Sequence, residues 1–276
     1  MPSTRQRHTW SPAHPEWVRY PMPIDSSIEL LIRRRVMSPE LRNFRDLVVA
    51  LPPSYADGDR RYPVVYMHDG QNLFDPLTSY AGAWGLAETL EALATSGTEA
   101  IVVAVPNTGR ARLYEYGPFR DRELGGGGGE RYLAFLAGTV KQLIDRSFRT
   151  DPAPEKTVVA GSSMGGLISL YALFRHSDTF GAAGAMSPSV WFANQEILAH
   201  AVRWAPLALG RRVYLDIGSD EGEEAVAHLR ALRDIFIASG FESGIDFDYV
   251  EDEGAIHHEA AWGRRAARAL PFLLGS

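Results

Sequence analysis

The chain has 276 residues, of which 45% are hydrophobic, and its formal net charge is −6. This length and composition are enough for one large core, and the acidic balance argues against a nucleic-acid partner, which would need a basic surface. The sequence contains no cysteine, so disulfides, thiolate metal sites and a cysteine nucleophile are excluded.

The first 23 residues are polar and rich in proline, with Trp10, Trp17 and Tyr20 spaced along them. They lack the apolar core of a secretory signal, and no later segment approaches the length of apolar run that a membrane span needs. We therefore expect an extended arm over residues 1–27 that lies on the surface of a single domain over residues 28–276. The expected location is the cytoplasm, without membrane insertion.

Short apolar runs alternate with longer amphipathic stretches in the rest of the chain. The runs predict strands over residues 28–37, 44–51, 63–68, 100–105, 157–160, 180–186, 213–217 and 245–250. The amphipathic stretches predict helices over residues 85–94, 130–146, 164–175, 222–237 and 259–270. The connection between the first two strands is too short for a crossover, so this pair should be antiparallel, whereas the later strands read as parallel strands covered on both faces. The pattern predicts an α/β fold with a mostly parallel, doubly wound sheet of eight strands.

A tract of five glycines occupies residues 125–129. Consecutive glycines hold a fixed path only at a high entropic cost, so the tract is expected to form a mobile loop. It lacks the Gly-Lys-Ser/Thr ending of a phosphate-binding loop, and no nucleotide site is expected there.

The segment Gly161-Ser162-Ser163-Met164-Gly165 matches the pattern Gly-x-Ser-x-Gly. An apolar run precedes it and a helical pattern follows at once, which is the context of a nucleophile elbow. Such a turn holds its serine at strained dihedral angles above the edge of the sheet, and the helix N-terminus beside it can stabilise an oxyanion. The pattern predicts that Ser163 is a nucleophile, and the alternative is a structural turn of small residues.

A serine nucleophile on this type of elbow has an acid and a histidine as partners, which follow it in that order along the chain. His257 and His258 come after the last predicted strand and before the last helix, where a loop can bring an imidazole to the serine. Candidate acids lie around the end of the preceding strand, with Asp216 inside it and Asp220 and Glu221 beyond it. Chain order fits this arrangement, but spacing alone leaves both choices open.

Taken together, these segments resemble the Putative esterase family of α/β-hydrolases, which includes esterase D, feruloyl and acetyl-xylan esterases, enterochelin esterases and mycolyltransferases. The resemblance runs from about residue 29 to the C-terminus. Its motifs are the segment from Tyr62 to Asp75 (YPVVYMHDGQNLFD), the elbow, Gly218 to Glu221 (GSDE) and His257 to Trp262 (HHEAAW). The resemblance implies an α/β-hydrolase fold without a large cap domain and a serine carboxylic-ester hydrolase that works through an acyl-enzyme.

Carried over to this sequence, the family pattern makes Ser163 the nucleophile. It selects Glu221, the third residue after the glycine that ends the strand, as the acid, and His257 as the base. His258 stands where the family more often has Asn, Asp or Ser, so His258 stays an alternative to His257 as the base. Asp220 likewise stays an alternative to Glu221.

The resemblance also implies an oxyanion hole formed by the backbone N–H groups of Met164 and Gln71. Aromatic residues on loops at the carboxyl ends of the strands, such as Tyr116 and Trp191, are expected to bind substrate, because ligands bind at that edge of such sheets. Residues 189–211 have room for about one helix, which is too little for a cap. We therefore expect an open cleft and a small-molecule substrate with a short acyl group on a bulky, aromatic or sugar-type alcohol.

No metal or other cofactor is expected. His68-Asp69 could form one corner of a metal site, but no second cluster at ligand spacing accompanies it. Trp262 replaces the second histidine of a zincin-like helix. Two other functions are compatible with the pattern: acyl transfer to a sugar or lipid acceptor with the same triad, and binding without catalysis. The oligomeric state is left open.

Overall fold

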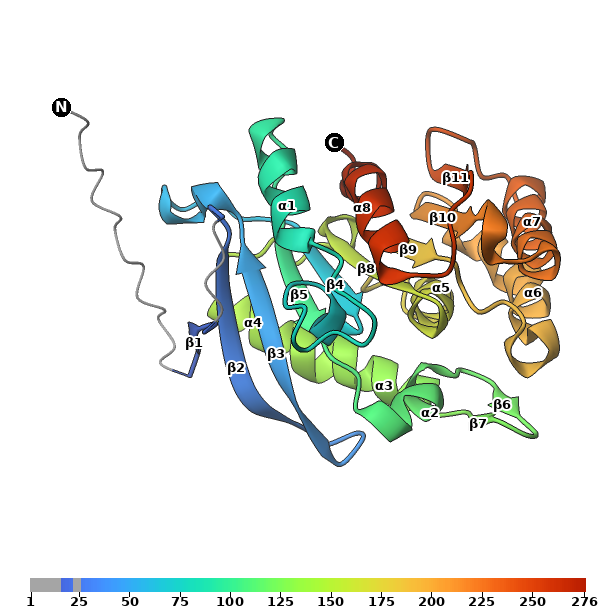
Figure 1. Ribbon diagram of the computed structural model, residues 1–276, viewed down its shortest axis with the longest axis horizontal. Helices are drawn as coiled ribbons and strands as arrows, with labels where there is room; N and C mark the ends of the chain where they lie inside the picture. The colour runs from blue at the N-terminus through green and yellow to red at the C-terminus, as the bar shows by residue number, and fades with distance from the viewer. Residues whose placement is uncertain (1–15, 22–25) are drawn as a thin grey trace.

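The computed structural model describes residues 16–21 and 26–276. Most of the predicted arm, Trp10 included, lies outside the described residues. A twisted sheet runs through the centre of the molecule, and helices cover both of its faces (Figure 1).

Nine strands of the described residues form this sheet, in the order β1-β2-β3-β5-β4-β8-β9-β10-β11. Their bounds are β1 (Val18–Arg19), β2 (Glu29–Ser38), β3 (Asn43–Leu51), β4 (Val64–His68), β5 (Ile101–Val105), β8 (Thr157–Ser162), β9 (Ala182–Met186), β10 (Arg212–Gly218) and β11 (Phe247–Asp252). The pairs from β1 to β5 are antiparallel, and all pairs from β5 to β11 are parallel. The predicted α/β fold with a mostly parallel sheet is confirmed, and the short strand β1 adds to the eight expected strands.

The helices are α1 (Leu86–Thr95), α2 (Arg112–Tyr116), α3 (Gly129–Ala134), α4 (Lys141–Ser147), α5 (Met164–Arg175), α6 (Phe192–Trp204), α7 (Glu223–Ala238) and α8 (Glu259–Leu274). The helix expected over residues 130–146 consists of α3, a π-helical segment (Phe135–Val140) and α4. The expected helices at α1, α5, α7 and α8 are also present. Within residues 189–211 the structure has α6 and one 3₁₀ turn (Ala205–Ala208), so this described segment holds no cap domain.

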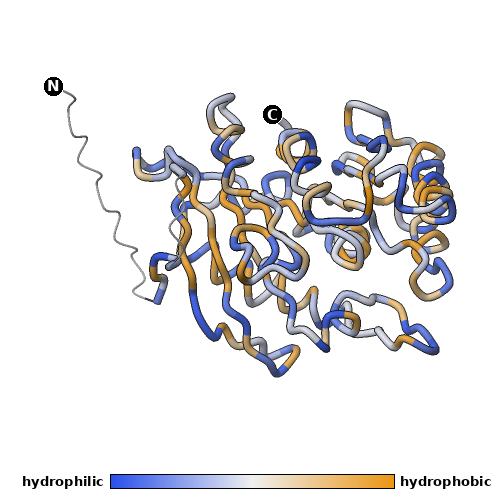
Figure 2. The backbone as a smooth tube through the Cα atoms, in the orientation of Figure 1, coloured by the Kyte–Doolittle hydropathy of each residue, from blue (hydrophilic) through white to orange (hydrophobic). Residues whose placement is uncertain are grey.

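Two apolar cores lie on opposite faces of the sheet. Alternate residues of β4 belong to different cores: Val64 and Tyr66 pack with α3 to α7, whereas Val65 and Met67 pack with α1 and α8. Because both faces are covered, the central strands are mostly apolar, as Figure 2 shows for the middle of the sheet. No helix formed by the described residues is long and apolar enough to span a membrane.

The described part of the arm adds an edge to the sheet. β1 pairs antiparallel with β2, with Val18 opposite Ile32. Trp17 is 2% exposed and packs edge-on against Phe148 at a centroid distance of 5.0 Å. These contacts attach residues 17–19 to the first core.

The glycine tract differs from the mobile loop expected for it. It closes a small hairpin, β6 (Arg120–Asp121) with β7 (Gly125–Gly126), and then begins α3. The N–H of Gly127 donates to the carbonyl of Gly117 at 2.8 Å. Gly126 has a φ of 85°, and a Cβ atom there would lie 2.7 Å from a ring carbon of Phe192. The glycines are therefore needed because the backbone has a left-handed conformation and packs closely there. The composition of the tract alone does not distinguish this requirement from flexibility.

Candidate active site

The predicted elbow is present between β8 and α5. Ser163 has φ 57° and ψ −123°, and its N–H donates to the carbonyl of Met186 at 2.9 Å. A Cβ atom at Gly161 or Gly165 would lie 3.0 or 3.1 Å from the Cβ of His68, so both glycines are needed for the close approach of β4. A left-handed φ at a non-glycine residue costs about 1–3 kcal/mol and is characteristic of functional sites.

The hydroxyl of Ser163 is partly buried and shares a hydrogen bond of 3.2 Å with the hydroxyl of Ser189. The N–H of Ser189 also donates to the carbonyl of Ser163 at 3.1 Å. Among the described residues, no hydrogen bond joins Ser163 to either predicted histidine. Ser189 lies in the segment from Ser187 to Trp191, which follows β9 and resembles the substrate-side loop of the family, but the sequence assigns it no role of its own.

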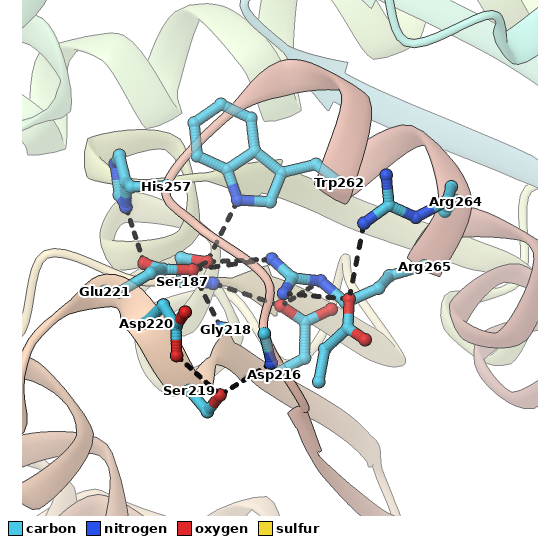
Figure 3. Close-up of polar contacts among 12 residues, drawn as sticks. Ser187, Asp216, Gly218, Ser219, Asp220, Glu221, His257, Trp262, Arg264 and Arg265 are labelled. Carbon is cyan, nitrogen blue, oxygen red and sulfur yellow. Dashed lines mark hydrogen bonds and ion pairs between the residues drawn. The ribbon is translucent and has the colours of Figure 1, made fainter.

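The predicted acid and base are in direct contact. Glu221 ends a 3₁₀ turn (Ser219–Glu221) after β10, and His257 lies on the loop between β11 and α8. The Oε2 atom of Glu221 lies 2.7 Å from Nδ1 of His257 (Figure 3). The Glu221 side chain is 3% exposed and that of His257 is 45% exposed. The imidazole thus has one edge on a buried carboxylate and the other open to a ligand.

The structure places the second histidine differently. His258 is the N-cap of α8, and its Nδ1 accepts a hydrogen bond from the N–H of Ala260 at 3.2 Å. A histidine in this position satisfies one of the helix's unpaired N–H groups. Its neighbour His257 also packs edge-on against Trp262, with ring centroids 4.8 Å apart.

The other two candidate acids do not contact the histidines. Asp220 is exposed, and its carboxylate accepts a hydrogen bond from Ser219 at 3.1 Å. Asp216 is fully buried and lies 3.2 Å from Nε of Arg265. Burial raises the pKa of Asp216 to about 7, even though the Arg265 guanidinium lowers it.

The environment of Glu221 favours its ionised form. Burial by itself raises the pKa of this carboxyl, but hydrogen bonds from His257, Ser187 and the N–H of Gly218 outweigh it, and the net pKa is lowered. The N–H of Gly218 lies 2.8 Å from Oε1. A carboxylate held in this way can stabilise a positive charge on the neighbouring imidazole.

The two predicted oxyanion donors lie at helix starts. Met164 is the first residue of α5, and Gln71 lies in a 3₁₀ turn (Gly70–Asn72) after β4. The N–H groups in the first turn of a helix have no acceptor within that helix. A Cβ atom at Gly165 would lie 3.5 Å from the carboxylate of Asp69, so the loop that carries Gln71 packs beside the elbow.

The loop that carries Gln71 is held by a cation, Arg112, that sequence reasoning missed. Asp69 has a φ of 53°, and its carboxylate accepts two hydrogen bonds from Arg112, at 2.8 and 2.7 Å. Asn107 donates to the same carboxylate at 2.6 Å. A bidentate guanidinium–carboxylate pair has a fixed geometry, so it fixes the turn that precedes Gln71.

The two predicted substrate-binding aromatics lie in different environments. Tyr116 is fully buried, and its hydroxyl accepts a hydrogen bond from the N–H of Asp69 at 3.1 Å. The prediction that Tyr116 binds substrate is therefore wrong: its ring packs against the rings of His68 and Tyr132, which also contact each other, and its hydroxyl holds the backbone of Asp69. Trp191 lies between β9 and α6, is 48% exposed and remains available to a ligand.

A cavity of about 300 Å³ adjoins the loop that carries Gln71. Gln71 and Phe74 line it, together with Val48 of the sheet and Tyr20 of the arm. The nucleophile, acid and base candidates are not among its lining residues, so the cavity is separate from them. Within residues 16–21 and 26–276, no group of three or more His, Asp or Glu side chains is arranged to hold a metal ion.

The chain is similar in sequence to known proteins. Residues 38–273 match the Putative esterase family. The chain is 29% identical to the uncharacterised protein YbbA of Bacillus subtilis, over 84% of this chain and 93% of that protein. It is 28% identical to the siderophore triacetylfusarinine C esterase of Aspergillus fumigatus, over 66% of this chain and 62% of that esterase.

The fold is also similar to solved structures. The BES protein of Bacillus cereus superposes with a TM-score of 0.75 at 22% identity, over 93% of this chain and 98% of that one. Since the family match covers most of the chain and includes the elbow and both partner loops, the chain belongs to the Putative esterase family and is an ester hydrolase of the α/β-hydrolase fold.

Proposed function

We propose that the protein hydrolyses carboxylic esters through an acyl-enzyme formed on Ser163. The observation that carries this proposal is the strained conformation of Ser163, at φ 57° and ψ −123°, between a buried strand and a helix N-terminus. A turn of small residues with no function has no reason to keep a non-glycine residue in this conformation. The nearby pair of Glu221 and His257 supplies the acid and base that a serine nucleophile requires.

In the first half of the reaction, Nε2 of His257 takes the proton of the Ser163 hydroxyl as Oγ attacks the ester carbonyl carbon. For this step the hydroxyl exchanges its present partner, Ser189, for the imidazole. The carbonyl oxygen becomes an oxyanion that accepts hydrogen bonds from the N–H groups of Met164 and Gln71. When the tetrahedral intermediate collapses, the C–O bond to the alcohol breaks, and the alcohol leaves with the proton from His257.

In the second half, water attacks the acyl carbon and gives a proton to His257, and the second tetrahedral intermediate releases the acid and restores Ser163. Glu221 stays ionised throughout and stabilises the imidazolium that forms twice in the cycle. Its lowered pKa supports this role at neutral pH.

The proposed substrate has a short acyl group and a bulky alcohol. The described residues between β9 and β10 hold one helix and no cap, and the exposed Trp191 offers a flat apolar surface beside the elbow. An open site can accept a large alcohol that a closed tunnel would exclude. Because a relative is named as an esterase of the siderophore triacetylfusarinine C, siderophore esters are a class to test beside simple aryl and sugar esters.

The proposal is tested by covalent labelling. A fluorophosphonate probe is expected to modify one peptide, at Ser163, and to stop the hydrolysis of p-nitrophenyl acetate in proportion. Ser163→Ala should lose both labelling and turnover, whereas Ser169→Ala, which removes a buried hydroxyl farther along α5, should keep both. Label on Ser162, or turnover that persists in Ser163→Ala, would overturn the assignment.

A further inference from the structure

Ser187 lies at the centre of a buried polar cluster behind Glu221. It follows β9, is 3% exposed and has a φ of 44°. Its hydroxyl lies 2.6 Å from Oε1 of Glu221, 2.9 Å from Nε1 of Trp262 and 2.9 Å from Nη2 of Arg265 (Figure 3). The cluster thus brings together the ends of β9 and β10 and the first turns of α8.

The chemistry of these partners fixes the direction of each hydrogen bond. An indole N–H and a guanidinium can only donate, so Trp262 and Arg265 occupy both lone pairs of the Ser187 oxygen. The single proton of the hydroxyl then points to Oε1 of Glu221, which is ionised and can only accept. Ser187 therefore donates to the carboxylate and cannot rotate to another acceptor without losing its two donors.

This arrangement decides which oxygen faces the histidine. Oε1 of Glu221 is taken by the hydroxyl of Ser187 and the N–H of Gly218, at 2.6 and 2.8 Å. Oε2 is left for Nδ1 of His257 at 2.7 Å. Since Oε2 is an acceptor, Nδ1 must carry the proton, and Nε2 keeps the lone pair that a general base needs.

Ser187 also separates Glu221 from a buried cation. Arg265 is 5% exposed and lies 3.7 Å from Oε1 of Glu221, beyond hydrogen-bond distance, while it lies 3.2 Å from Asp216 and 3.6 Å from Asp252. A direct bidentate pair between Arg265 and Glu221 would occupy both carboxylate oxygens. The Ser187 hydroxyl accepts a hydrogen bond from Arg265 and donates one to Oε1 of Glu221, so Oε2 stays free for His257.

We propose that Ser187 is a positioning residue of this site: it orients the Glu221 carboxylate and thereby sets the tautomer of His257. This inference rests on the function proposed above, with His257 as the base. Ser187 does not touch the reacting atoms, and its effect passes through Glu221.

The test compares Ser187→Ala with Ser38→Ala. Ser38 is also fully buried and donates to a carboxylate, that of Glu40, at 3.2 Å, but it is the last residue of β2, next to the turn that leads to β3. With active sites counted by titration, Ser187→Ala should lower kcat about tenfold and change KM less than about twofold, the pattern for a lost transition-state interaction. Ser38→Ala should leave the titrated kcat unchanged.

A spectroscopic readout separates positioning from simple loss of folding. The proton on Nδ1 of His257 in a short hydrogen bond should give a low-field signal in the ¹H NMR spectrum of the wild type. Ser187→Ala should move or broaden this signal, and Ser38→Ala should not. Trp262→Phe removes one donor to Ser187, so its effect on the signal and on kcat should be smaller in the Ser187→Ala background than in the wild type.

The outcomes distinguish this inference from the proposed function. If the wild type hydrolyses esters and labels at Ser163, but Ser187→Ala keeps the wild-type kcat and the wild-type low-field signal, the positioning role is wrong and the mechanism stands. If the wild type does not label at Ser163, the proposed function itself fails, whatever the Ser187 variant does.

Discussion

Glu221 and His257 form a pair in which a buried acid contacts an exposed base: Oε2 and Nδ1 are 2.7 Å apart, yet the side chains are 3% and 45% exposed. The acid is shielded from water, so its interaction with the imidazole is weakened little by solvent. The imidazole edge that faces away from the acid stays accessible to substrate. This asymmetry is what a general base that must alternate between two protonation states requires.

The two adjacent histidines should respond very differently to substitution. His257→Ala removes the proposed base and should lower kcat about a thousandfold or more. His258→Ala removes a helix cap, so it should lower the free energy of unfolding by about 1 kcal/mol and leave kcat within a few-fold of the wild type. Steady-state kinetics and urea unfolding of both variants measure the difference. An inactive His258→Ala protein with normal stability would show that the base is His258.

Replacing the acid should give an intermediate loss. Glu221→Gln keeps the shape of the side chain but can donate to the imidazole, which favours the wrong tautomer of His257. We expect kcat to fall by about ten- to a thousandfold, which is less than in His257→Ala. Asp220→Asn, on the exposed neighbouring acid, is the matched control and should stay close to wild-type kcat. Equal losses in the two variants would reject Glu221 as the specific partner.

The lack of a cap in residues 189–211 predicts a preference for short acyl groups. In a series of p-nitrophenyl esters, kcat/KM should be highest from acetate to butyrate and low for palmitate. Each methylene that the site leaves in water forgoes about 0.8 kcal/mol of binding free energy. A maximum of kcat/KM at acyl groups of about ten carbons or more would mean that the protein encloses the acyl group. It would contradict the prediction drawn from the lack of a cap in residues 189–211.

Stability should fall below neutral pH because His68 is buried in its neutral form. Burial lowers the pKa of His68 to about 3, whereas its pKa in the unfolded chain is about 6.5. Between these values the unfolded chain binds a proton that the folded protein does not, so stability is complete above about pH 6.5 and is lost as the pH falls toward 3. His68→Gln should reduce the slope of unfolding free energy against pH by up to about 1.4 kcal/mol per unit in this window. The unfolding free energy of both proteins is measured by urea unfolding at pH 7, 6 and 5. An equal slope against pH in the wild type and in His68→Gln would contradict this prediction.

The sequence by itself determined the sheet, most of the helices and the elbow. These features depend on local rules: a strand covered on both faces must be apolar, and a sharp strand-to-helix turn at Ser163 needs glycine at positions 161 and 165. The order of the motifs and their resemblance to a family then pointed to Glu221 and His257. The cytoplasmic location and the boundary of the arm at residue 27 stay predictions.

Only the tertiary structure decided which side chains meet. Tyr116 looks like a loop aromatic in the sequence, but the chain folds over it and its hydroxyl supports Asp69. Ser187 contacts Glu221, Trp262 and Arg265, which are 34, 75 and 78 residues away in the sequence. Local periodicity specifies how each segment is built, but contacts over such separations depend on the register and packing of several strands and helices at once, and no pattern within one segment encodes them.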